Sequence, residues 1–311
     1  LFSEEKIQKI KRRNSGFIPL DYVYDRNFRK VLKKKQPILY KKTAGKSIEE
    51  FMDFMMEKRL NIDAFELFEA EYKEAERSIE TQEPIAWKET LTDLSYVINY
   101  AIKHFSAEDM LRFKRSLSPL ISIIIAFVPQ SSAREIMALN HAGILDVINV
   151  DKDSTVVPSK EGGCIYTYRN KSKRKEKKHF AMFIDALGQQ PFNFKQLPFE
   201  GLINKNTLST AFLNFADQEI AIREFENGNK EVYKDKSGIY LLRLPGISIN
   251  DHFQPLNQYG VANARLHVMA VPFISGVNPD YSGLDFCEVA SDRILSHLIV
   301  KPKSQQAILS Q

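Results

Sequence analysis

The sequence lacks the glycine pattern that dinucleotide-binding folds use to approach a pyrophosphate. Its 13 glycines are scattered, and none has Gly-x-Gly-x-x-Gly spacing. Cysteine is scarce as well, because Cys164 and Cys287 are the only two. They are too few and too far apart for a disulfide framework or a zinc site. We interpret both as structural thiols in a reducing compartment, which predicts a cytoplasmic location.

Patterns that hold metals or create nucleophiles are also missing. No two of the six histidines have the i, i+4 spacing of a helical metal site. The chain contains no Gly-x-Ser-x-Gly, the turn that exposes a catalytic serine in many hydrolases. The sequence therefore predicts no metal site, and it identifies no catalytic side chain.

Long hydrophobic runs are absent. The longest one, Leu117–Val128, is interrupted by two serines and a proline and is too short to cross a bilayer. Residues 1–16 lack the apolar core of a signal peptide, so we expect no membrane association. The net charge of +5 over 311 residues is small, and by itself it does not indicate a nucleic-acid partner.

The first half of the chain is rich in helical patterns. Ser47 followed by Glu50 forms the signature of a capping box, which predicts a helix start. Ser106 with Asp109 and Ser132 with Glu135 predict two more starts, and Gly143 predicts a stop. Helices are expected over residues 4–13, 48–59, 64–78 and 87–105.

The hydrophobic period changes after residue 145, where short strands are expected. Cys164–Arg169 and His179–Ile184 flank the basic run Asn170–Lys178, which we interpret as a solvated hairpin tip. Alternation in Arg265–Val271 predicts a strand, and Leu284–Ile299 has the pattern of an amphipathic helix. The remaining strand predictions are residues 144–150, 154–157, 239–244 and 247–249.

Two short motifs favour ordinary structure over chemistry. Ala44-Gly45-Lys46-Ser47 ends like a phosphate-binding loop, but Tyr40 stands where the motif needs glycine. The pair Asp251-His252 has the residue types for acid–base chemistry, yet a plain loop pair is the favoured interpretation.

Three segments carry a resemblance to a known family. Phe180–Pro191 is a strand pattern that ends in a small-residue turn, and Leu266–Ile299 combines a strand, a loop and a helix. Pro84–Ile148 contains Trp87 and the motif Ser106-x-x-Asp109-x-x-Arg112-Phe113-x-Arg115. Together, over about residues 84–300, they resemble the bacterial FAD-NAD(P)-binding family of uncharacterised flavoproteins. This family is distantly similar to flavin monooxygenases and pyridine-nucleotide oxidoreductases.

The resemblance implies a fold class and an activity. The expected fold is mixed α/β, similar to the C-terminal part of a flavoprotein with two dinucleotide-binding domains. A mostly helical region, 1–145, with a family-like insertion from about 84, would precede an α/β and β-meander region, 146–311, that ends in a strand-helix unit. The implied function is that of a fragment of an FAD-dependent oxidoreductase, with NAD(P) as a further cofactor and an unknown substrate.

The same resemblance places candidate flavin contacts and a missing segment. The cofactor-binding positions it implies are Gly188, Pro191, Gly276, Ser282 and Gly283. Because the glycine-rich turn is absent and the chain starts at Leu1, we expect a dinucleotide-binding segment before Leu1. We also expect no FAD on this chain alone. An unpaired sheet edge left by that segment would favour homo-oligomerisation.

Two alternatives of other classes stay open. The first is a non-enzymatic helical protein-interaction module built on residues 46–145, since a fold does not imply a function. The second is a weak nucleic-acid binder that uses the basic loops. It is disfavoured, because the run Asn170–Lys178 lacks interleaved aromatic residues.

Overall fold

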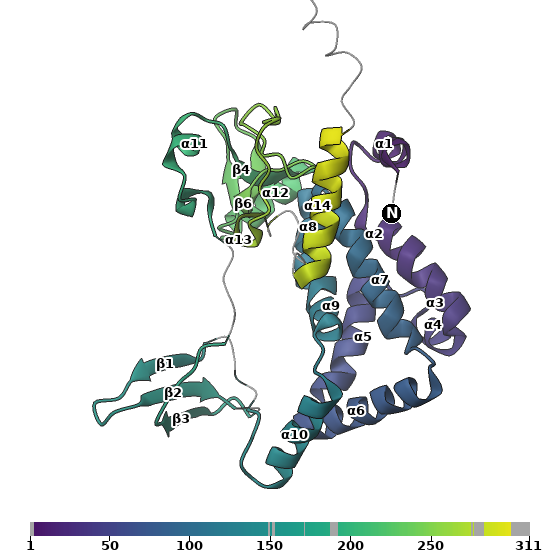
Figure 1. Ribbon diagram of the computed structural model, residues 1–311, viewed down its shortest axis with the longest axis vertical. Coiled ribbons are helices and arrows are strands. Elements are labelled where there is room, and N and C mark those ends of the chain that lie inside the picture. Colours follow the sequence, from purple (N-terminus) through teal and green to yellow (C-terminus); the bar gives the residue numbers. More distant parts are fainter. Residues whose placement is uncertain are drawn as a thin grey trace, which may run out of the picture. The chain divides into compact units, whose positions relative to one another are not determined.

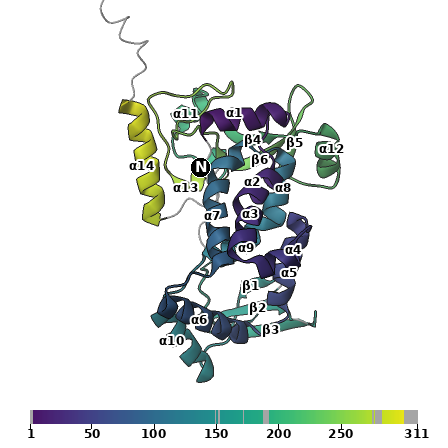
Figure 2. The same cartoon turned by 90° about the vertical axis from the view of Figure 1, so that its right-hand side faces the viewer.

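The computed structural model (Figures 1 and 2) describes residues 3–148, 150, 153–170, 172–186, 192–274, 276 and 283–299. Its contacts divide the chain into two compact units. The first unit comprises Leu1–Asp53, Ala86–Ala126 and Gln190–Gln311, and the second comprises Phe54–Ile85 and Phe127–Gln189. This division by packing differs in kind from the boundary expected at residue 145, which marks a change of secondary structure.

The N-terminal half of the first unit is a cluster of helices (Figure 1). A π-helical turn, Asp25–Arg29, joins two of them, and a 3-10 turn, Ile102–His104, follows another. The helices are α1 Glu4–Arg13, α2 Leu20–Tyr24, α3 Lys30–Lys35, α4 Pro37–Thr43, α5 Ile48–Leu60, α7 Ala86–Ala101, α8 Ala107–Arg115 and α9 Leu117–Ile125. α5 begins in this unit and ends in the other.

Large apolar side chains from these helices form a continuous core. Tyr24, Phe28 and Phe51 pack ring against ring, with Phe28 and Phe51 centroids 5.2 Å apart in an edge-to-face arrangement. Fully buried residues of the same core include Leu20, Leu32, Ile48, Leu91, Leu94, Ile98, Ile102 and Met110. Their burial, at about 1.5–3 kcal/mol for each large side chain, is the main stabilising contribution here.

Two of the three predicted helix starts are confirmed and one is wrong. Ser47 and Glu50 form the reciprocal capping box, with Glu50 N donating to Ser47 Oγ at 3.1 Å and Ser47 N to Glu50 Oε2 at 2.7 Å. Ser106 caps α8 as expected. The start at Ser132 is wrong, because α10 (Gln130–His141) begins directly after Pro129, whose fixed backbone suits a helix entry.

The C-terminal half of the first unit contains a three-stranded antiparallel sheet in the order β4-β6-β5. The strands are β4 Thr210–Asn214, β5 Val232–Lys234 and β6 Tyr240–Ile247. Around it lie η3 Phe194–Gln196, α11 Glu200–Asn204, α12 Gln218–Glu226, α13 Val271–Ile274 and α14 Gly283–Ile299. The α14 prediction over 284–299 is confirmed, but much of the helix is solvent-exposed, including Val289 and Leu298.

The strand predicted at Arg265–Val271 is wrong. Residues 266–270 form irregular chain that joins no sheet, and Val271 begins α13. Val268 N donates to Phe253 O instead of to a neighbouring strand. Pro272 has no N–H, so it suits the first turn of a helix better than a ladder position. The strand expected at 144–150 is also absent from its described residues, which form a turn and irregular chain after α10.

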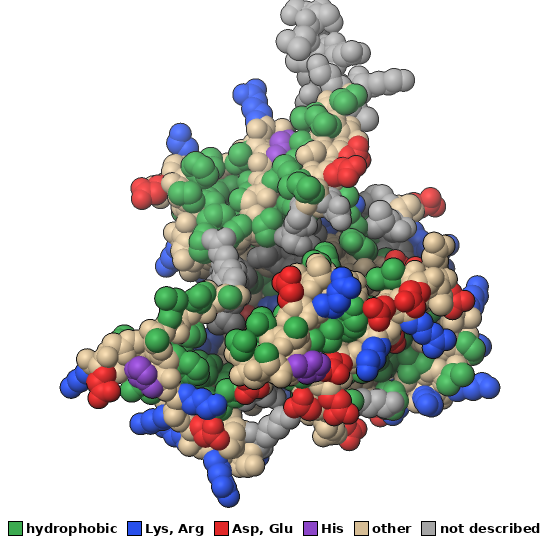
Figure 3. Space-filling view, turned by 60° about the horizontal axis from the view of Figure 1, so that its bottom comes forward, with side chains coloured by type: hydrophobic (Ala, Val, Ile, Leu, Met, Phe, Trp, Pro, Cys, Tyr) green, Lys and Arg blue, Asp and Glu red, His purple; other side chains and the backbone are tan. Residues whose placement is uncertain are grey.

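The second unit combines two helices with another three-stranded antiparallel sheet. α6 (Ala64–Thr81) packs on α10, and the sheet runs β1-β2-β3. Its strands are β1 Thr155–Pro158, β2 Cys164–Arg169 and β3 Lys175–Phe180. Lys and Arg side chains stand out at the end of this sheet, at the lower left of Figure 3.

The described chain is therefore a mixed α/β protein with a helical N-terminal region followed by small antiparallel sheets. No single helix among the described residues is long and apolar enough to span a bilayer, and α9 and α10 reach such a length only when counted together.

Candidate functional site

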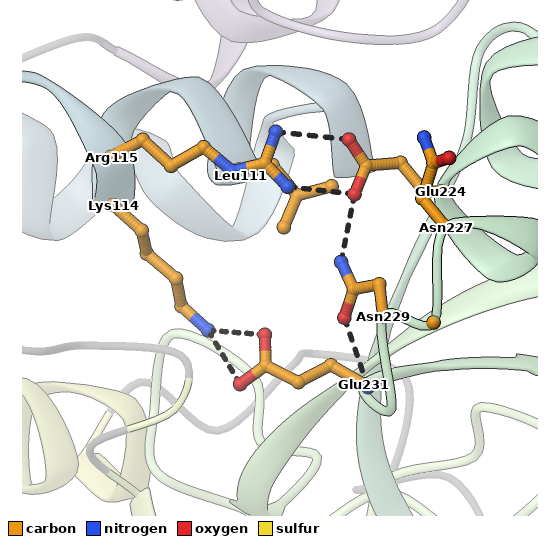
Figure 4. A pocket seen from close by; sticks show the side chains of 8 residues that line it. Leu111, Lys114, Arg115, Glu224, Asn227, Asn229 and Glu231 are labelled. Atoms are coloured by element: carbon orange, nitrogen blue, oxygen red, sulfur yellow. Dashed lines mark hydrogen bonds and ion pairs between the residues drawn. The ribbon is translucent and has the colours of Figure 1, made fainter. Parts of the chain in front are cut away.

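A polar cleft lies within the first unit, beside the C-terminal end of α8 (Figure 4). Its volume is about 520 Å³. α8 contributes one wall, and α12 with the turn into β5 contributes the other. The lining residues are Leu111, Lys114, Arg115, Glu224, Asn227, Gly228, Asn229 and Glu231.

Ion pairs bridge the two walls of this cleft. Arg115 Nη1 and Nη2 donate to the two carboxylate oxygens of Glu224 at 2.9 and 2.7 Å. Asn229 Nδ2 donates to the same carboxylate at 2.9 Å, and Lys114 Nζ pairs with Glu231 at 3.2 Å. The hydrogen bond from Arg115 holds the pKa of Glu224 below its ordinary value. Both cations sit in the last turn of α8, where the helix dipole favours positive charge.

This arrangement favours the binding of a polar group over acid–base chemistry. The carboxylate of Glu224 has a lowered pKa and so remains ionised at neutral pH, which makes it a poor proton donor. The donors and acceptors of the cleft already satisfy one another. A charged ligand therefore has to break these ion pairs and replace them with its own.

One turn earlier on α8, Arg112 joins three carboxylates. Its guanidinium donates to Asp21 at 2.8 Å, to Glu49 at 2.9 Å and to Asp109 at 3.0 Å. Asp109 is the most buried of the three, with its side chain 15% exposed, and it also accepts from Leu20 N at 2.9 Å. Burial raises the pKa of Asp109, whereas the hydrogen bond from Arg112 lowers the pKa of Glu49. This network connects α2, α5 and α8.

A second polar cluster gathers around His252. Its ring stacks on His297 of α14 with centroids 4.0 Å apart, and His252 O accepts from His267 Nδ1 at 2.7 Å. Asp251 forms an ion pair with Lys103. Burial and, next, the charge of His297 lower the pKa of His252. Burial alone would raise the pKa of Asp251, but the Lys103 ammonium outweighs it and the pKa is lowered.

Two features distinguish this cluster from an ordinary loop. His252 Nδ1 and His267 Nε2 are buried without a hydrogen-bond partner among the described residues. Phe253 has φ +58°, a left-handed conformation that is uncommon for a bulky residue. The pair Asp251-His252, interpreted from sequence as a plain loop, thus lies in a set of titratable groups. Among the described residues no group of three His, Cys, Asp or Glu side chains is placed to hold a metal.

Of the five residues implied as flavin contacts, Gly276 and Gly283 lie among the residues that the structure describes. Gly188, Pro191 and Ser282 lie outside the described residues. Gly283 is the first residue of α14. Gly276 packs against β6, where a Cβ would lie 2.0 Å from Pro245 O. This contact accounts for a glycine at 276 without any ligand, and the flavin role of these positions stays a prediction.

Sequence reasoning named Arg112 and Arg115 only as motif positions and missed Glu224, Asn229 and Glu231. Their partners stand 63 to 117 residues away in the chain, so no local pattern reveals the pairing. The only available signal was the Asn227-Gly228-Asn229 turn sequence after a charged helical pattern.

Comparison with known proteins matches part of the chain. Residues 3–125 match the family described as the YdhS-like middle domain. The uncharacterized protein YdhS of Escherichia coli strain K12 is 26% identical over 156 residues. That similarity covers 50% of this chain but only 28% of the length of the relative. The N-terminal helical region is thus similar to a YdhS-like middle domain, including residues 3–83, for which the sequence alone suggested no family.

Proposed function

We propose that this chain supplies the middle region and a C-terminal α/β region of a flavin-dependent, NAD(P)H-linked oxidoreductase. One observation supports this most: residues 3–125 match a domain described as a middle one, and a middle domain implies neighbours. The matched relative is also much longer than the similarity. The arrangement of two dinucleotide-binding domains belongs to this proposal and rests on the sequence resemblance.

The described residues do not fit the dinucleotide half of a flavin site. Both described sheets are antiparallel, whereas an ADP-binding turn needs a parallel βαβ unit with its glycine-rich loop. Gly276 has no free space beside β6. In the proposed protein, other residues would therefore hold FAD, and flavin would supply the hydride and electron transfer.

The role that remains for this chain is structural support beside the cofactor domain. The α8 network ties α2, α5, α12 and the turn before β5 into one body through Arg112, Lys114 and Arg115. Glu108 adds to it by accepting from Ala216 N and Asp217 N at the start of α12. A support built from such cross-links keeps the wall of a site in place, which is what positioning of a substrate requires.

Visible absorption spectra test the proposal directly. The 311-residue chain is expected to be colourless, and the product of the complete reading frame is expected to show flavin bands that NAD(P)H bleaches without oxygen. A yellow 311-residue chain with about one flavin per chain would show that the dinucleotide site is misplaced. A complete product that stays colourless after incubation with FAD would refute the flavin function itself.

The upstream coding sequence provides an independent test. We expect a strand followed by Gly-x-Gly-x-x-Gly within about 150 residues before Leu1. A Met codon directly before Leu1, with no coding sequence ahead of it, would contradict this expectation.

A protein-interaction module is the second candidate, and exposed apolar side chains in the second unit favour it. Phe127 is 88% exposed, Ile144 is 75% exposed and Ile184 is 76% exposed. Side chains of this kind often mark protein-interaction surfaces. Colourless complete protein that forms a stoichiometric complex would support this candidate over the oxidoreductase.

A further inference from the structure

The basic run Asn170–Lys178 of the second unit is only partly a loop tip, because its last four residues belong to a strand. Lys175–Phe180 forms β3, and only residues between Arg169 and Lys175 make the turn. β2 and β3 pair in register from Cys164↔Phe180 to Arg169↔Lys175. The register therefore assigns each strand cation to one of the two faces of a ribbon, which the interpretation as a solvated hairpin tip did not specify.

Cations collect on one face of this ribbon. Residues directly opposite one another in an antiparallel pair point to the same side, and successive pairs alternate. Arg169↔Lys175, Thr167↔Lys177 and Ile165↔His179 therefore share a face, and that face carries no acidic strand residue. The turn adds the exposed side chains of Lys173 and Arg174.

Four of these basic side chains differ from most of those on α8. Lys173, Arg174, Lys175 and Lys177 are exposed and form no ion pair with the residues that the structure describes. The nearest acidic strand residue, Glu176, lies on the opposite face. There it accepts from Tyr168 Oη at 2.7 Å and from Asn170 Nδ2 at 2.6 Å, so it does not neutralise the basic face.

The opposite face is already engaged by the second unit itself. Tyr166 stacks with Phe183, at 6.3 Å between centroids, and Val147 and Ile148 line a pocket with Tyr168 and Lys178. The aromatic side chains thus lie away from the basic face. A ligand on the basic face meets charge without stacking partners, which favours a phosphate backbone over unpaired bases.

The shape of the ribbon favours a nucleic-acid duplex over other polyanions. β1 pairs with β2 only as far as Thr155↔Thr167. Beyond it, Tyr168↔Glu176, Arg169↔Lys175 and the turn continue as two strands. A two-stranded ribbon fits the major groove of a duplex, which is about 12 Å wide. We propose that the basic face of β2 and β3 binds the phosphate backbone of double-stranded DNA, without base specificity.

The number of cations on the basic face predicts how steeply duplex binding depends on salt. Five cations, Arg169, Lys173, Arg174, Lys175 and Lys177, contribute a slope of about −0.9 × 5, or about −4.5, in log K against log salt. Binding of a labelled duplex of about 20 base pairs to the whole chain is measured by fluorescence anisotropy. A fourfold rise in salt, from about 50 to about 200 mM, should weaken it about 500-fold.

Charge-neutralising variants locate the surface. Lys175→Gln with Lys177→Gln should reduce the slope by about 1.8, because two phosphate contacts are lost. The control, Lys41→Gln with Lys42→Gln, removes the same charge from exposed positions of α4 and should leave the slope unchanged. Far-UV circular dichroism verifies that both variants keep their secondary structure, because Trp87 lies in the first unit and does not report on β3.

Each outcome decides the proposal. The predicted slope, its loss in the β3 variant and its retention in the α4 variant support it. No duplex binding at low salt overturns it, and so does an equal effect of both variants. Tighter binding to single strands, or binding to phosphatidylserine vesicles without binding to the duplex, assigns the face to another polyanion and also overturns it.

Discussion

Removal of Arg112 tests whether the α8 network stabilises the first unit. Arg112 is only 35% exposed and links three carboxylates. Its two more exposed ion pairs, with Asp21 and Glu49, contribute about 0.5–2 kcal/mol together, since exposed pairs are each worth about 0.2–1 kcal/mol. Loss of the charged hydrogen bond to the largely buried Asp109 adds about 1.5 kcal/mol. We therefore expect Arg112→Met to lower the free energy of unfolding by about 3 kcal/mol.

The matched control is Arg115→Met on the same helix. Arg115 is 61% exposed and pairs with one carboxylate, so its loss should cost about 1 kcal/mol or less. Urea unfolding followed through Trp87, the only tryptophan, reports on α7 in the first unit. The reasoning is refuted if the two variants differ by less than about 0.5 kcal/mol, the usual scale of neutral surface changes.

Acid should reduce the difference in free energy of unfolding between wild type and Arg112→Met. The pKa of Glu49 is lowered in the folded state, chiefly by the hydrogen bond from Arg112. A lowered carboxyl pKa contributes stability that is present above the unfolded pKa, near about 4.3, and is lost as pH falls through the folded pKa. Wild type should thus lose this contribution below about pH 4, whereas the variant has none to lose. A gap that is unchanged by acid would show that Arg112 acts through packing rather than charge.

Two further predictions concern the C-terminal half of the first unit. The pKa of His252 is lowered by burial and by His297, so the unfolded state takes up protons first, and stability should fall as pH drops below about 6.5. Hydrogen exchange along α14 should accelerate at acid pH in wild type and accelerate less in His297→Phe, which retains the stacked ring without its charge, whereas burial, the larger cause, remains in both proteins. Equal acceleration in both proteins would exclude the histidine pair as the cause. Gly246→Ala should be severely destabilising, because φ is +83° and a Cβ would lie 2.0 Å from Phe273 O. Gly260→Ala, at φ +76° with open space around it, should cost only about 1 kcal/mol, and a thermal melt that ranks the two equally would contradict the packing argument.

Local structure was largely predictable from the sequence. The helix start at Ser47 and its partner Glu50 interact across three residues, so the pattern contains both members of the interaction. Gly143, with φ +70°, follows the end of α10. It is also a local signal, because a glycine in the left-handed conformation ends many helices. The bounds of β2 match the prediction Cys164–Arg169, because a hairpin with alternating residues encodes its own register.

Predictions that depended on distant partners did less well. Arg265–Val271 has an alternating pattern, but a strand also requires a neighbour with free backbone groups, and Val268 N meets Phe253 O outside any sheet. β4 and β5 were missed because each is short and takes its pairing from β6. The candidate flavin positions stay predictions, since three of the five lie outside the described residues.

By itself, the sequence determined the mixed α/β composition, the helix caps and the absence of a glycine-rich dinucleotide turn, because each depends on residues within a few positions of one another. Only the tertiary structure decided that Arg112 joins carboxylates from α2, α5 and α8. It likewise decided that a basic run becomes one charged face of a ribbon. Charge and hydrogen bonding act over a few ångströms of space, and the distance between two residues along the chain does not specify that separation.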